Sequence, residues 1–245
     1  VEWKNLMLEK LAKGLPWAPT QGKVSGSLTL TGPLPKEKEP FPGKLEVDFQ
    51  VEDLLLKPTD GAHPIEVIRL TGHGDFNQGL LQHEIHATVW GSDFDIKGKL
   101  QMGQGRPVLN SRINWQGLDV SQLPLPSTGW QASEGKLTGT LTLIGPVPGA
   151  GEKFPGQLKT SLKFAAKNLK LQNKSSPDSP LLALNQLKGT GLNLSTDTLP
   201  IDIQQLEGKA TLDRGRLKHN LNGTMFGGKV KTKGALLFQK IKEET

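Results

Sequence analysis

The chain has 245 residues, no cysteine, a formal net charge of +6 and a pI near 9.4. Without cysteine it can form no disulfide, use no thiol nucleophile and bind no metal through thiolates. Its mean hydropathy is −0.39, and no apolar run approaches the roughly 18–20 residues of a membrane-spanning helix. Because the sequence starts without the basic and apolar regions of a signal peptide, we expect it to be part of a longer protein.

The positive charge does not predict a nucleic-acid partner. Most lysines stand singly and alternate with apolar residues, which is typical of the solvated face of a β-sheet. Nucleic-acid-binding domains instead gather their basic residues on one face. We therefore predict no nucleic-acid partner.

One helix is predicted, at the start of the chain. Apolar residues recur there at helical spacing, and the pattern predicts a helix over Trp3–Lys13 that ends at Gly14, with Pro16 beyond it. Residues 1–16 are accordingly predicted to be an N-terminal helix and a lead-in to the strands. A shorter helical turn is predicted around Asp119–Leu123.

The rest of the chain is predicted to be strands. Leu45, Val47, Phe49 and Val51 alternate with polar residues, which places one set on each face of a strand. Similar alternation occurs at 81–89, 94–102, 158–164, 217–225 and 230–238. Gly-Pro, Phe-Pro-Gly, Asn-Gln-Gly and Asp-Arg-Gly separate the strands and indicate hairpins and loops. We count about a dozen strands, joined mostly as an antiparallel meander.

The strands belong to two tandem copies of one unit. Gly22–Pro35 recurs as Gly135–Pro148 at an offset of 113, and Gly79–His83 recurs as Gly215–His219 at an offset of 136. The first β repeat is predicted to span residues 17–117 and the second residues 118–245. The larger offset predicts an extra hairpin in the second repeat, between Leu192 and Ala210.

A sheet with one apolar face must bury that face, and a single terminal helix cannot cover it. The sheet can close on itself as a sandwich or barrel, or curl into a trough whose inside is filled by a ligand. The apolar rows are rich in leucine and interrupted by glycines such as Gly26, Gly98 and Gly139. Strand glycines weaken packing or mark a close approach. We interpret them as gaps in a compliant channel for acyl chains.

Two sets of motifs resemble the AsmA-like family, which includes YhdP and TamB relatives. Met225–Val230 is similar to its aromatic-Gly-Gly-x-Val/Leu signature. The first repeat has Ser92 where the second has Gly228. Asn114–Leu123, followed by Gly135–Leu141, resembles a Gly-Leu-Asp-Val/Leu-Ser-x-Leu element that precedes Gly-x-Leu-Thr-Gly. The resemblance extends over nearly the whole chain from Trp17 onward.

The resemblance implies a fold, a location and a function. The fold would be a long, curved, mostly antiparallel sheet with a hydrophobic groove, often called a β-taco. The location would be the periplasm, with an inner-membrane anchor outside this sequence. The function would be to shield acyl chains of phospholipid or another lipid during transport between the inner and outer membranes. Partners would include the membrane and neighbouring repeats of a longer chain.

The sequence gives little support for catalysis or for a cofactor. His83 and His86 are three residues apart, so on a strand they face opposite sides and cannot easily bind one metal. Asp93 and Asp95 share a face, but no partner motif accompanies them. His83 and His219 lie within apolar rows, where they are either structural or contact a lipid headgroup. We predict a non-enzymatic protein without metal or cofactor.

The candidate lipid-groove residues are apolar and predicted to face inward. They are Leu28, Leu30, Leu45, Val47, Phe49, Ile85, Val89, Leu141, Leu143, Leu158, Leu162, Phe164, Leu221 and Met225. Two alternatives remain: a β-sandwich binding module, for which Trp17, Trp90, Trp115 and Trp130 are candidate surface aromatics, and a structural spacer of an envelope protein.

Overall fold

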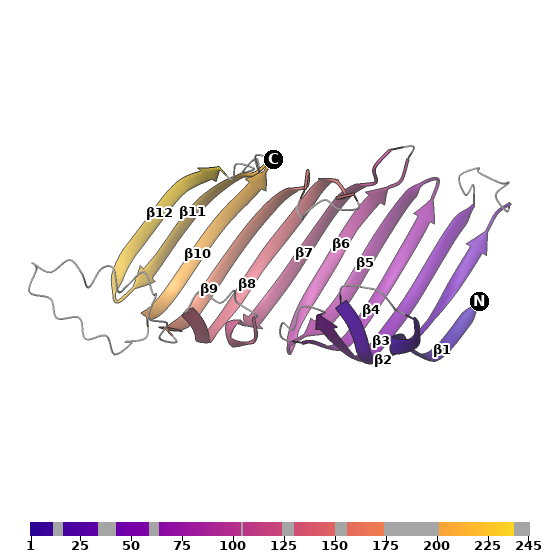
Figure 1. The fold of residues 1–245 in the computed structure, drawn as a ribbon, viewed down its shortest axis with the longest axis horizontal. Coiled ribbons are helices and arrows are strands. Elements are labelled where there is room, and N and C mark those ends of the chain that lie inside the picture. Colours follow the sequence, from indigo (N-terminus) through magenta and orange to yellow (C-terminus); the bar gives the residue numbers. More distant parts are fainter. Residues whose placement is uncertain are drawn as a thin grey trace, which may run out of the picture.

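The computed structural model describes residues 1–11, 17–33, 43–58, 64–103, 105–123, 130–149, 156–173 and 201–237. These residues form one antiparallel sheet of twelve strands, in which each strand lies beside its neighbours in the sequence (Figure 1). The prediction of an all-β, mostly antiparallel meander of about a dozen strands is confirmed.

The strands of the first half are β1 (Glu2–Met7), β2 (Trp17–Thr31), β3 (Lys44–Pro58), β4 (Ile65–Asn77), β5 (Leu80–Val89) and β6 (Ser92–Gln101). Those of the second half are β7 (Val108–Asp119), β8 (Trp130–Pro146), β9 (Lys159–Asn173), β10 (Ile201–Asp213), β11 (Arg216–Met225) and β12 (Gly228–Leu237). The helices are α1 (Leu8–Leu11) and the 3₁₀ turn η1 (Val120–Gln122). The position of η1 confirms the predicted short helical turn, and Asp119 caps it by accepting from the Ser121 N–H at 3.0 Å.

The predicted helix over Trp3–Lys13 is wrong in its first half. Glu2–Met7 is a strand that pairs with β2, and Leu8–Leu11 is helical, whereas the predicted end of the helix at residues 12–14 lies outside the described residues. The apolar spacing that predicted a helix results from a bulge in this strand at Asn5, which has a positive φ of 54°. It brings Trp3 and Leu6 to the same face of the strand, opposite Gly26 and Val24. A bulged strand thus repeats its apolar residues three apart, as a helix does.

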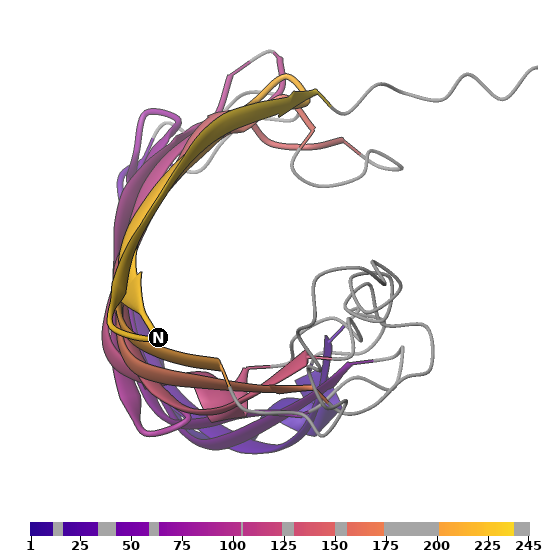
Figure 2. The ribbon, with the colours of Figure 1, turned by 90° about the vertical axis from the view of Figure 1, so that its left-hand side faces the viewer.

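The sheet curls into a C in cross-section (Figure 2). The helical turn α1 lies within this curve, and Leu8 of α1 packs against the apolar cluster of Val51, Leu54 and Val67. We call the apolar side of the sheet the inner face and the opposite, charged side the outer face. The alternation of apolar and polar residues along each strand determines this division.

Few residues on the inner face are fully buried. Several buried hydrophobic residues of the described ranges lie near the strand ends beside α1 and η1; examples are Leu118 (4% exposed) and Val67 (4%). Among the described residues, no large side chain is less than 2% exposed. The described strands therefore form one layer rather than two packed sheets.

Residues with left-handed backbone recur in both halves of the sheet. Asn5 (φ 54°) corresponds to Gly117 (φ 65°), and Asp53 (φ 52°) corresponds to Asn168 (φ 52°). The turn between β4 and β5 corresponds to the turn between β10 and β11. The turn between β5 and β6 likewise corresponds to the turn between β11 and β12, where Phe226 (φ 51°) matches Trp90 (φ 49°). The structural equivalence begins in β1 and β7, upstream of residues 17 and 118, where the sequence places the starts of the repeats.

Aromatic rings fill the spaces above four strand glycines, which corrects the interpretation of Gly26 and Gly139 as gaps. Trp3 covers Gly26, and an added Cβ on Gly26 would lie 2.6 Å from the Trp3 ring. Phe49 likewise covers Gly72, at 2.3 Å. The second repeat has the same arrangement, with Trp115 over Gly139 and Phe164 over Gly208. Because glycine has no side chain, each ring can approach the neighbouring strand closely.

The additional chain of the second repeat lies between β9 and β10. The offset between equivalent residues is 115 at Phe49 and Phe164 but 136 at Gly72 and Gly208. The predicted extra hairpin falls largely on residues 174–200, which lie outside the described residues. Ala210, its predicted end, belongs to β10, and β10 pairs directly with β9.

The fit of Phe49 over Gly72 gives a stability prediction. Gly72→Ala should lower the free energy of unfolding by about 1–3 kcal/mol, because the new methyl group displaces the ring. Gly74→Ala is the matched control on the same face of β4, since its Cβ would lie 3.7 Å from Leu81, an ordinary contact. That control should be unchanged or stabilised by up to about 1 kcal/mol. Urea unfolding measures both, and equal losses would contradict this packing.

Candidate functional site

The candidate site is the inner face, and all fourteen predicted groove residues lie on it. Cross-strand pairs share a face, and the register pairs Leu28 with Val47, Leu30 with Leu45, and Leu141 with Leu162. The remaining members lie on the same face by alternation along their strands: Phe49, Ile85, Val89, Leu143, Leu158, Phe164, Leu221 and Met225. Only Leu158 is fully buried (3% exposed), whereas Leu30 at the strand end is 46% exposed.

A continuous apolar row crosses the middle of the sheet. Ile85 on β5 pairs with Ile96 on β6, which pairs with Ile113 on β7, then Leu141 on β8 and Leu162 on β9. Each of these side chains is only half-buried. Ile96 and Ile113 were missing from the predicted set, although the alternation at 94–102 placed Ile96 on an apolar face. The row presents branched aliphatic side chains across five adjacent strands.

Polar groups on the inner face are few. His83 on β5 extends across Gly98 on β6, and its Nε2 lies 3.2 Å from the Ser111 Oγ on β7. Burial lowers the pKa of His83 below its ordinary value, so its neutral form is favoured. His219, the equivalent residue of the second repeat, packs against Gly234. Both histidines therefore have structural contacts within the sheet.

Trp115 is a packing residue rather than a surface platform. Its side chain is 8% exposed, covers Gly139 and stacks on Phe94 with ring centroids 6.3 Å apart. Its Nε1 has no hydrogen-bond partner among the described residues, which is also true of the Thr160 hydroxyl. The side chains of Trp17 and Trp130 lie outside the described residues. The surface aromatics of a carbohydrate-binding sandwich are thus not supplied by Trp115.

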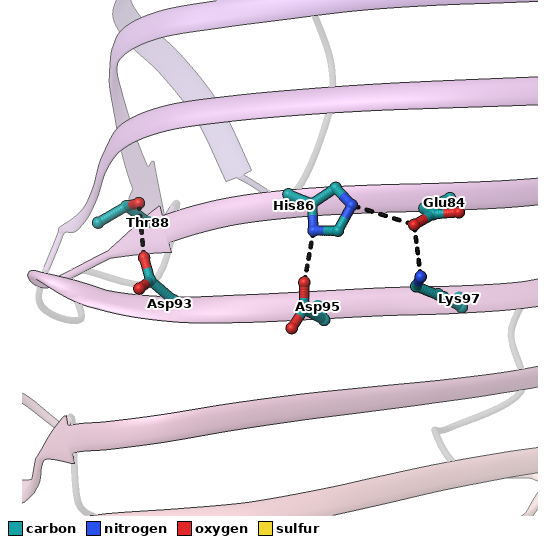
Figure 3. A network of polar contacts seen from close by, with 6 residues as sticks. All are labelled: Glu84, His86, Thr88, Asp93, Asp95 and Lys97. Carbon is teal, nitrogen blue, oxygen red and sulfur yellow. Dashed lines mark hydrogen bonds and ion pairs between the residues drawn. The ribbon is translucent and has the colours of Figure 1, made fainter.

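The outer face carries a charged network on β5 and β6 (Figure 3). His86 contacts both Asp95 and Glu84, and Lys97 lies 2.5 Å from Glu84. The hydrogen bond from Lys97 is the main cause that lowers the pKa of Glu84. Asp93 accepts from the Thr88 hydroxyl at 3.0 Å. These groups are exposed, so the network contributes little to stability.

The two neighbouring histidines of β5 lie on opposite faces of the sheet. His83 is on the inner face and His86 on the outer face, as their spacing predicts. The described residues contain no group of three metal-ligating side chains. Two shallow depressions among the described residues lie on the outer face and are lined mainly by polar residues such as Asp48, His73 and Arg112. They do not provide an apolar binding site.

Comparison with known proteins found no matching family model, no matching curated protein and no matching solved structure. None of the helices in the described part of the chain has the length and apolar character needed to cross a bilayer.

The buried position of His83 gives a pH prediction. Its pKa is lowered on folding, so the unfolded chain binds a proton there more readily, and this favours unfolding as the pH falls below about 6.5. His83→Gln should therefore lose less stability than the wild type between pH 7.5 and 5.5. Ile85→Val is the control, because it weakens the same face without removing a titrating group. Parallel pH profiles for wild type and His83→Gln would contradict the prediction.

Proposed function

We propose that the inner face binds acyl chains of phospholipid or a similar lipid and shields them from water. The observation that carries this proposal is the half-buried apolar row from Ile85 to Leu162, which no second layer of described strands covers. Apolar surface of this extent is unfavourable in water, and such patches mark sites of interaction. The curve of the sheet brings the apolar face around the space that an extended chain would occupy (Figure 2).

The chemistry of the inner face suits hydrocarbon rather than a polar ligand. Each methylene group moved from water to an apolar surface contributes about 0.8 kcal/mol, so a long acyl chain needs no hydrogen bonds to bind. The few polar side chains on this face, such as His83 and Ser111, are already in contact with each other. The proposed ligand class is therefore defined by its acyl chains, and its headgroup would lie beyond the apolar rows.

The AsmA-like resemblance supports the cellular part of the proposal. Its motifs fall on corresponding structural elements: Met225–Val230 forms the turn between β11 and β12, and Asn114–Leu123 forms the end of β7 and η1. Trp90 and Gly91 adopt the same left-handed turn in the first repeat, although Ser92 replaces a glycine there. We place the protein in the periplasm, anchored to the inner membrane by a segment outside this sequence. There it would support phospholipid transport between the two membranes without catalysing a reaction.

Site-specific photo-crosslinking tests the proposal. A benzophenone side chain at position 141 should capture phospholipid in cells, because Leu141 faces inward. The same group at position 142 should not, because Thr142 is adjacent on β8 but faces outward. Mass spectrometry of the adducts measures both. Protein-only adducts at position 141 would contradict the lipid proposal and favour the structural-spacer alternative.

A charged substitution separates an accessible inner face from a closed core. Leu143→Glu should remove co-purifying lipid but cost only about 1–2 kcal/mol of stability, because position 143 is half-buried. Leu118→Glu is the contrasting variant: Leu118 is 4% exposed, and an unpaired charge there should cost about 3–5 kcal/mol. Thermal melts and lipid extraction provide the readouts. Equal destabilisation by both substitutions would show that position 143 is inside a closed core.

A further inference from the structure

The edge of the sheet formed by β12 is unpaired within the described part of the chain. β12 pairs with β11 on one side only, so the backbone N–H and C=O groups on its other side are available to another strand. Its apolar side chains are correspondingly exposed: Val230 is 38% and Leu236 is 55% exposed. Lys229, Lys231 and Lys233 occupy its outer face, and none has an ion pair among the described residues.

The seam between the two repeats shows which strand such an edge accepts. β6 is the first-repeat equivalent of β12, since Gly98 corresponds to Gly234 and the preceding turns match. The far side of β6 pairs antiparallel with β7, and Phe94 lies opposite Trp115. The two rings stack there, which covers Phe94 on the side away from β5.

β1 is the equivalent of β7 at the opposite edge of the sheet. Trp3 and Trp115 each stand over a glycine of the following strand, Gly26 or Gly139. In both strands the register shifts three residues later, after a residue with positive φ. Within the described residues β1 pairs with β2 alone. One edge of the molecule therefore carries a strand of the type that the other edge accepts.

We propose that β12 binds β1 of a second copy of this chain, which continues the curved sheet head to tail. The part of the β6–β7 register that Val1–Lys4 can reproduce places Trp3 opposite Val230 and Glu2 opposite Lys231. Trp3 covers the exposed Val230 as Trp115 covers Phe94, and Glu2 supplies the missing negative charge beside the lysines of β12. Lys4 falls opposite Lys229, and this like-charge pair weakens the association. The proposal does not depend on lipid binding.

Disulfide trapping tests the register. Because the native chain has no cysteine, every disulfide that forms must join the introduced cysteines. The Glu2→Cys and Lys231→Cys proteins, mixed under mild oxidation, should yield a disulfide dimer as the major product, because directly opposed Cα atoms lie about 4.5–5.5 Å apart. Ala235→Cys is the matched control on the same face of β12, four residues away and roughly 13 Å along the strand. That distance exceeds the roughly 7 Å limit for a disulfide.

The competing arrangements give different products. A disulfide dimer of Lys231→Cys alone at equal yield would indicate symmetrical pairing of two β12 edges and would overturn the proposal. Equal trapping with Ala235→Cys, or a monomer at all concentrations by analytical ultracentrifugation, would also overturn it. Association only with anionic vesicles would assign the basic edge to a membrane instead. Circular dichroism of each variant verifies that the sheet is intact, and Glu2→Lys in the otherwise native chain should reduce self-association.

Discussion

Antiparallel hydrogen bonding between strands adjacent in the sequence holds this molecule together. Each of the twelve strands pairs with its sequence neighbours, and the described strands contribute no second layer. The apolar side chains must therefore find their burial within one curved face, by contact with residues on neighbouring strands. This arrangement leaves the middle of the inner face half-buried, and it leaves two sheet edges unpaired within the described ranges. The half-buried inner face is the proposed lipid site, and the two unpaired edges are the proposed site of self-association.

Packing within a single layer depends on matching large rings with glycine. A ring that lies over a strand glycine packs against the neighbouring strand, and it does so without a facing sheet. Trp3 with Gly26 and Phe49 with Gly72 use this solution in the first repeat, and the second repeat uses it again. Phe49 and Phe164 lie in the middle of their strands, and Trp115 lies on β7, the strand that joins the two repeats. The aliphatic row between them, from Ile85 to Leu162, remains available to a ligand.

The two faces of the sheet have separate chemistry. Charged residues such as Glu84, His86 and Lys97 gather on the outer face, where their contacts are exposed and weak. The inner face contains mainly hydrocarbon and aromatic groups, with a few polar side chains such as His83, Ser111 and His219. A surface of this kind can hold an extended apolar molecule along the sheet. Adding strands at β12 would lengthen that surface without changing its cross-section.

The sequence by itself determined the features that depend on local pattern: strands from period-two alternation, turns such as Asn77-Gln78-Gly79, the duplication, and the division of residues such as Leu141 and Thr142 between two faces. Tertiary structure decided what depends on pairing between distant residues. It made Glu2–Met7 a strand, because this segment pairs with β2. The bulge at Asn5 gives that strand the apolar spacing of a helix, which is why the sequence pattern alone predicted a helix. It also decided that strand glycines receive aromatic rings, since a ring and its glycine are joined only by cross-strand register. The curvature that places the apolar face inside is likewise a property of the assembled sheet and not of any one strand.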